Sequence, residues 1–354
     1  MKKIRNVFDH NCHPRFPGCA TISHLVAAGF SLRILTRAKA RGYIERPIVR
    51  MNDKSVIFSL SIMIILTLLL TSCSLKQRVT GLVGVVSWDG QSAIERESEV
   101  DLVRSSFFPL VKSMEVLQSG SPNDRLYLTL LSKAYGEFAF GFLEEDLIKF
   151  KGNPKEYDKA FHLADTFYKR GLDYSMRAMR TKKGYRDGLD SSPMDFAKAL
   201  KSAGKKDLPL LFWTAFCWGN WINLHKDEPS AIIEVPKVTE LINRVIEIDP
   251  NYHFGSGYAF LGVIDASRPA MLGGNTQKAK ESFEKSIELS DKYLFNKVLY
   301  AQFYAVAAQD KALFERLLNE VMETPDNIFP EQELSNRLAK RRAKVLLEGK
   351  RNYF

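Results

Sequence analysis

The chain has 354 residues, of which 45% are apolar and 26% charged, a balance typical of a globular protein with a substantial core. Its formal net charge is +10 at pH 7, but residues 1–72 hold 11 of the 51 Lys and Arg residues and only 3 of the 41 Asp and Glu residues. The remainder therefore has a net charge of only +2, which removes the argument for a nucleic-acid partner.

Residues 1–50 precede any recognisable export signal, and we expect them to be a non-native or disordered N-terminal extension. They contain a group of side chains that could suggest a zinc site: His10, Cys12, His13, Cys19 and His24. Their spacing lacks the two short ligand pairs that structural zinc sites use. We therefore predict neither a metal site nor a cofactor.

A charge-free run of fifteen residues, VIFSLSIMIILTLLL, extends from Val56 to Leu70. A membrane-spanning helix needs roughly 20 apolar residues, whereas this length suits the apolar region of a signal peptide. Met51-Asn-Asp-Lys54 would supply the short basic start that precedes such a region. The sequence therefore predicts a signal peptide over residues 51–72.

The signal segment ends in Leu70-Thr71-Ser72-Cys73, which resembles a lipobox. Such a motif is cleaved before a cysteine that carries acyl chains, so we predict lipidation of Cys73, a lipidated tether over residues 73–100, and a periplasmic protein anchored to a bacterial membrane. The alternative is an ordinary signal peptide or short anchor helix with a chance cysteine. If the chain is cleaved before Cys73 and this residue is lipidated, Cys217 has no disulfide partner and is expected to be a small buried apolar residue.

The segment from Ser74 to Gly90 is rich in Gly and Val and is expected to be a tether or a lone strand. From Arg125 onward, apolar residues recur at spacings of three and four, which indicates helices and an all-α fold. Pro and Gly residues end these periodic runs. The predicted helices are 125–150, 156–179, 193–203, 208–224, 236–248, 257–266, 276–290, 294–308, 311–323 and 331–347.

Two helix pairs show internal similarity. Gly219 and Gly262 lie 43 residues apart, each in the first helix of a pair, and the second helices start about 41 residues apart. This pattern favours a tetratricopeptide-like repeat, in which neighbouring pairs stack into a curved solenoid over residues 101–354. The alternative is a helical bundle with coincidental spacing.

Sequence motifs for catalysis are not found. The chain contains no GxxxxGK[ST], GxGxxG or HExxH motif, and Gly255-Ser256-Gly257 lacks the GxSxG form of a nucleophile elbow. His225 and Asp227 occupy a polar helix end, where a solvated cap is the favoured role. We predict that the protein is not an enzyme.

The segment Leu208–Leu224, LPLLFWTAFCWGNWINL, is apolar on nearly all sides and contains three of the four Trp residues. Such a helix is buried on several faces. Either Asn220 bonds the backbone of a neighbouring helix and the Trp residues are core, or this helix lines a cavity in which Asn220 orients a ligand.

Pro269 and the pair Gly273-Gly274 predict a shaped turn, followed by Asn275 as an N-cap. Arg268 beside this turn could bind a carboxylate or cap the carbonyl groups of the preceding helix. Our candidate ligand-binding residues, which would line a pore, are Trp213, Trp218, Asn220, Trp221, Tyr258 and Arg268.

Five segments resemble the T component of tripartite ATP-independent periplasmic (TRAP) transporters, the TatT family, and the resemblance spans about 126–347. These segments are Tyr135–Phe142, Trp218–Asn223, Arg268–Gly274, Lys297–Ala301 and Leu338–Lys344. Residues 1–50 correspond to nothing in the family.

The resemblance implies a periplasmic lipoprotein that forms a homotrimer and binds the substrate-binding P component of a TRAP transporter. It also implies a hydrophobic pore that passes apolar ligands or carboxylates. The rival hypothesis is a helical-repeat scaffold lipoprotein in outer-membrane or envelope assembly.

Overall fold

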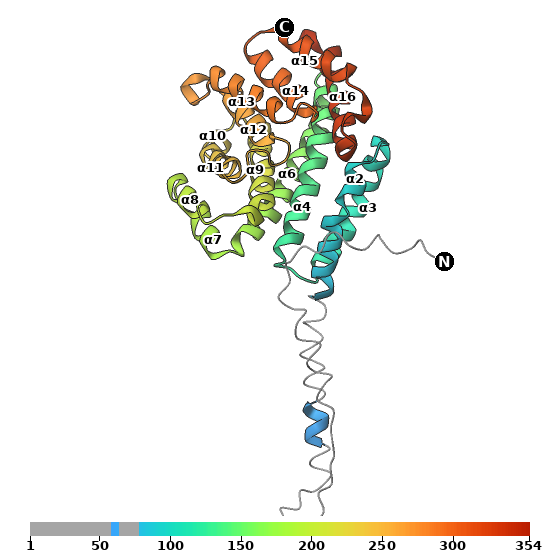
Figure 1. Ribbon diagram of the computed structural model, residues 1–354, viewed down its shortest axis with the longest axis vertical. Coiled ribbons are helices and arrows are strands. Elements are labelled where there is room, and N and C mark those ends of the chain that lie inside the picture. Colours follow the sequence, from blue (N-terminus) through green and yellow to red (C-terminus); the bar gives the residue numbers. More distant parts are fainter. Residues whose placement is uncertain (1–57, 64–77) are drawn as a thin grey trace, which may run out of the picture. The chain divides into compact units, whose positions relative to one another are not determined.

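The computed structural model describes residues 58–63 and 78–354. Two units are distinguished, residues 1–61 and 62–354, and the helical body discussed below belongs to the second. Every regular element in the described part of the chain is a helix, so the all-α prediction is confirmed (Figure 1). Among the described residues, no helix has both the length and the apolar character that a membrane span requires.

Residues 78–89 are helical and lead into the numbered elements. Several boundaries fall within one or two residues of the prediction, because Pro, Gly and capping residues set them. In chain order the helices are α2 (Gln91–Glu95), α3 (Val100–Gln118), α4 (Arg125–Phe138), α5 (Glu144–Lys149), α6 (Pro154–Arg180), α7 (Lys183–Leu189), α8 (Pro193–Leu200), α9 (Leu208–Leu224), α10 (Pro229–Ile232), α11 (Val235–Ile248), α12 (Ser256–Ala266), α13 (Thr276–Leu289), α14 (Phe295–Leu299), α15 (Lys311–Glu323) and α16 (Glu333–Glu348).

Two π-helical segments interrupt longer helices. Ala139–Leu143 joins α4 to α5, and Tyr300–Ala305 follows α14. The sequence predicts the long helices but not these widened turns, because the apolar spacing is not altered enough to reveal them. Such insertions are frequent at functional sites, and both segments contribute to the cavities described below.

The structure corrects the interpretation of the N-terminal part of the predicted tether. Residues 78–89 are helical rather than a strand, and Gly84 lies against the ring of Tyr127 in α4. Helix α3 was also missed, because Pro109 lies inside it and several of its apolar side chains are exposed, which obscures a single apolar face. Helix α7 lies between the predicted helices 156–179 and 193–203, where no helix was predicted. Residues 73–77, including Cys73, and the predicted export signal except 58–63 lie outside the described residues.

Helices α4, α6 and α9 pack against one another at the centre of the body (Figure 1). Their close approach depends on small residues: a Cβ atom on Gly171 would lie 2.7 Å from the Sγ of Cys217 and 3.1 Å from the carbonyl oxygen of Ser132. Cys217 is fully buried as a free thiol, as the sequence predicts, and burial raises its pKa to about 12.

The two predicted pairs are present as α9 packed on α11 and α12 packed on α13. A Cβ atom on Gly262 would meet the ring of Phe283 at 2.8 Å, so the helices cross closely at this glycine, as the repeat interpretation requires. The turn after α12 is shaped as predicted: Gly273 has a φ of 84°, and Asn275 caps α13 by accepting from the N–H of Lys278. The curved solenoid arrangement itself stays a prediction.

Candidate functional site

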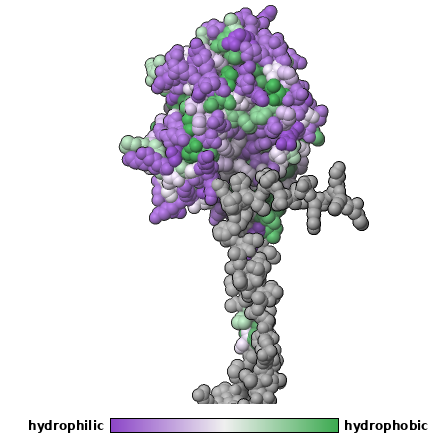
Figure 2. All heavy atoms as spheres, in the orientation of Figure 1, coloured by the Kyte–Doolittle hydropathy of each residue, from purple (hydrophilic) through white to green (hydrophobic). Residues whose placement is uncertain are grey.

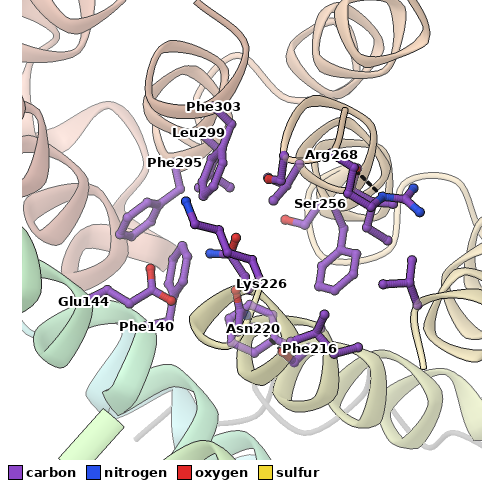
Figure 3. Close-up of a pocket in the computed structure, with 18 of the residues that line it drawn as sticks. Phe140, Glu144, Phe216, Asn220, Lys226, Ser256, Arg268, Phe295, Leu299 and Phe303 are labelled. Carbon is purple, nitrogen blue, oxygen red and sulfur yellow. Dashed lines mark hydrogen bonds between the residues drawn. The ribbon is translucent and has the colours of Figure 1, made fainter. Parts of the chain in front are cut away.

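A cavity of about 370 Å³, cavity 1, lies between α9, α12, α14 and the two π-helical segments. Figure 3 shows Phe295, Leu299 and Phe303 on one side, Ser256 and Arg268 on another, and Asn220 on α9. Its lining is largely apolar, with Lys226 and Arg268 as its basic groups. A mostly apolar cavity with few polar groups is typical of small-molecule sites.

A second cavity of about 320 Å³, cavity 2, is formed by α2, α3, α4, α9 and α16 together with neighbouring loops. Apolar and aromatic side chains dominate it, among them Phe107, Phe138 and Trp213. Its charged lining consists of Glu95, Lys133 and Glu137. Most of the elements that form it differ from those around cavity 1.

The two cavities share a wall of five ring-bearing residues. These are Phe140, Phe216, His253, Tyr293 and Phe295. The ring of Phe140 lies 4.8 Å from that of Phe295 and 5.3 Å from that of Phe216, centroid to centroid. We call this set the aromatic wall. Aromatic contacts of this kind tolerate several ring geometries.

A buried ion pair supports the aromatic wall from behind. Arg342 on α16 is fully buried, and its Nη1 lies 3.2 Å from Glu144 Oε2, while its Nη2 donates to the carbonyl oxygen of Phe140 in the π-helical segment. Its guanidinium also stacks over the rings of Phe140 and Phe295, at 4.3 and 5.2 Å from their centroids. Burial raises the pKa of Glu144, although Arg342 and the hydroxyl of Tyr168 favour its ionised form. Arg342 therefore fixes two residues of the wall at once.

His253 is held in the aromatic wall by an unusual loop. His253, Phe254 and Gly255 have φ values of 48°, 61° and 72°, three consecutive residues in the left-handed region. The imidazole Nδ1 lies 3.1 Å from the hydroxyl of Ser256, and the ring stacks against Phe212 at 4.8 Å. Burial and the nearby charge of Lys133 lower the pKa of His253 to about 3. The ring is therefore neutral at physiological pH.

The depressed pKa of His253 predicts a pH dependence of stability. The unfolded chain takes up a proton on this residue below its ordinary pKa of 6.5, whereas the folded protein does so only near pH 3. The contribution of neutral His253 to the free energy of unfolding is therefore fully present above pH 6.5. It falls as the pH is lowered toward 3, by at most about 1.4 kcal/mol per pH unit. Urea unfolding from pH 7.5 to 4 should show the difference between wild type and His253→Gln shrinking as the pH falls. A pH-independent difference would rule out this role for His253.

The six predicted ligand-binding residues divide between the cavities and the core. Trp213 lines cavity 2, while Asn220 and Arg268 line cavity 1. Trp218, Trp221 and Tyr258 line neither cavity: Trp218 is buried in the core, and the Trp221 Nε1–H donates to Asp165 at 3.0 Å. The structure thus brings together only part of the predicted set. Ligand binding by any of them stays a prediction.

Three local alternatives can be assessed directly. The Nδ2 of Asn220 donates to the carbonyl oxygen of Phe216 in its own helix, so the interpretation that it bonds a neighbouring helix is wrong. Arg268 caps the preceding helix, as one alternative held, because its Nε donates to Ile264 at 3.0 Å. His225 is not simply a solvated cap: its Nε2 lies 2.8 Å from Asp165 and its Nδ1 2.8 Å from Glu228, and only 11% of its side chain is exposed.

Sequence reasoning missed Lys133, Glu137, Arg342 and all five residues of the aromatic wall as site residues. Phe140 and Glu137 do lie in the quoted segment Tyr135–Phe142, where Glu137 directly precedes an apolar run. The His and Cys residues near the N-terminus, which were not predicted to bind a metal, lie outside the described residues. Within residues 58–63 and 78–354, no group of His, Cys, Asp and Glu is arranged to hold a metal ion.

Comparison with known protein families gives one match. The family model described as "TRAP transporter T-component" matches residues 96–354, about three quarters of the chain and all of α3 to α16. No curated protein matches the sequence.

Proposed function

The chain belongs to the T-component family of TRAP transporters, and from this premise we propose that it binds an apolar ligand in its two cavities, or a carboxylate-bearing ligand in cavity 1, and passes it to the substrate-binding P component. As a T component it is an accessory part of a TRAP transport system. The observation that carries the proposal is the aromatic wall shared by cavities 1 and 2. A ligand would cross it by displacing rings, without any change in the backbone.

Cavity 1 is the better entrance for a carboxylate. Lys226 is exposed and lines its edge, and Figure 3 shows Lys226 and Arg268 at the same cavity. The Nε and Nη1 groups of Arg268 donate to the backbone carbonyl oxygens of Ile264 and Leu272, which fixes the guanidinium in place. A positioned guanidinium and an exposed ammonium provide electrostatic attraction for an anionic head group, while the apolar lining accepts its tail.

We propose further that acyl chains on Cys73 hold the protein on a bacterial membrane, facing the periplasm. Five residues carry the chain from Cys73 to position 78, a distance of at most about 18 Å when fully extended. The helix that begins there exposes four apolar side chains, Val79, Leu82, Val85 and Val86. An apolar helix face so close to an acyl anchor suits contact with a lipid surface. Figure 2 shows that the visible face of the body is otherwise largely hydrophilic.

We propose a P component as the partner and a homotrimer as the assembly, on the ground of family membership alone. Photo-crosslinking of the lipidated protein in its native bacterium, followed by mass spectrometry, tests the first. We expect a periplasmic substrate-binding protein of a TRAP system among the captured partners. Capture of outer-membrane assembly proteins without any such binding protein would instead favour the envelope-scaffold alternative.

A further inference from the structure

Cavity 2 differs from cavity 1 in its charge balance: two basic and two acidic residues line cavity 1, namely Lys226, Arg268, Glu144 and Asp227, whereas one basic and two acidic residues line cavity 2. The Nζ of Lys133 lies 2.6 Å from Glu95 Oε1 and 3.7 Å from Glu137 Oε1, so one ammonium group serves two carboxylates. These three are the charged residues that line the cavity, which leaves one uncompensated negative charge when all are ionised. Lys133 is also placed over the ring of Trp213, 5.5 Å from its centroid.

Glu137 is the group that a ligand would meet. Lys133 forms its hydrogen bond with Glu95, and the more distant Glu137 keeps 42% of its side-chain surface open. Glu137 also lines cavity 2, and its burial raises its pKa to about 7. A carboxylate in such a place has lost much of its hydration and gains strongly from a cationic partner.

The remaining lining supports the same ligand class. Eight Phe, Tyr and Trp residues surround cavity 2: Phe107, Phe138, Phe140, Phe142, Trp213, Phe216, Tyr293 and Phe295. The faces of aromatic rings attract ammonium groups through their quadrupoles. The two titratable rings of the lining are neutral. Burial and the charge of Lys133 lower the pKa of His253 to about 3, so its imidazole is unprotonated, and burial raises the pKa of Tyr293, so its phenol keeps its proton.

We propose that cavity 2 binds the ammonium head group of an amphiphile, with Glu137 as its counter-ion and the aromatic side chains around its apolar part. The proposal rests on the proposed function, because it assigns a ligand class to one of the two cavities. An alkylcarboxylate would add a second uncompensated negative charge and is disfavoured there. A zwitterionic lipid would place its phosphate in the same apolar surroundings and is disfavoured for the same reason.

Three probes with the same tail test the proposal: octylamine, octanol and octanoate. Calorimetric titration uses the chain carrying Cys73→Ala, so that no lipid or detergent competes, at pH 8, because burial raises the pKa of Glu137 to about 7. We expect octylamine to bind at least about tenfold more tightly than octanol in cavity 2, and to displace it. Lysophosphatidylcholine should not displace octylamine, which separates a free amine from a lipid head group.

Two variants assign the effect to this cavity. Glu137→Gln and Glu95→Gln each remove one negative charge with little change of shape, and either should abolish most of the tenfold preference for octylamine. Glu281→Gln on α13, an exposed glutamate outside both cavities, is the matched control and should leave the preference unchanged.

Octylamine binding no more tightly than octanol, or an undiminished preference in Glu137→Gln, would overturn the proposal while leaving the proposed transport function intact. If none of the three probes binds, both fail. If octanoate binds more tightly than octylamine and does so through Lys226, cavity 1 is the ligand site and the assignment of cavity 2 is wrong.

Discussion

Replacing Arg342 with Ala is expected to lower the free energy of unfolding by about 3–5 kcal/mol, because Glu144 would be left as an uncompensated buried charge. The guanidinium is fully buried, pairs with Glu144 and contacts Phe140 in the π-helical segment. Urea unfolding at pH 7.5 measures the change. Arg316→Ala is the control, since Arg316 is an exposed partner of Glu320 and should cost less than about 1 kcal/mol.

The double variant Arg342→Met, Glu144→Met separates ion pairing from packing. Removing both charges leaves no uncompensated charge in the core, so the double variant should lose less stability than Arg342→Met alone. If Arg342→Ala costs no more than Arg316→Ala, the buried pair does not support the aromatic wall.

Replacing Cys73 with Ala should move the protein from the membrane fraction to the soluble periplasmic fraction of the expressing cells. Acyl chains on Cys73 would provide the attachment, whereas the exposed apolar face of residues 78–89 is too small to hold the protein by itself. The fold should be unchanged, with the same far-ultraviolet circular dichroism and melting temperature.

Cys217→Ala is the control for this experiment, since Cys217 is buried between α4, α6 and α9 and takes no part in anchoring. This variant should remain in the membrane fraction. A Cys73→Ala protein that still sediments with membranes would disprove the acyl anchor.

The helical content and most helix ends after residue 125 could be predicted from the sequence, because they depend on local signals. Asn275 caps α13 through its own side chain, and Gly273 supplies the left-handed conformation that the preceding turn needs. Helix α3 carries no comparable signal. Pro109 lies inside it, where proline usually ends a helix, and several of its apolar side chains are exposed, so its apolar residues do not mark one buried face.

The candidate site could be predicted only in part, because residues distant in the chain form it. Arg342 and Glu144 are 198 positions apart, and Lys133 and Glu95 are 38 positions apart. The sequence does identify α9 as a buried aromatic helix, but which of its faces meets a cavity depends on packing: Trp213 lines cavity 2, whereas Trp218 and Trp221 line neither cavity. Periodicity alone carries no such information.

Binding of cis-parinaric acid, a fluorescent fatty acid, tests most directly whether the cavities that share the aromatic wall hold an apolar ligand. Leu299 lines cavity 1, so Leu299→Trp would fill part of the cavity, whereas Met194→Trp adds the same ring to an exposed position on α8. Fluorescence titration should show saturable binding to the wild type and to Met194→Trp, and binding at least about tenfold weaker to Leu299→Trp. Equal binding to both Trp variants, or no saturable binding to the wild type, would contradict the claim.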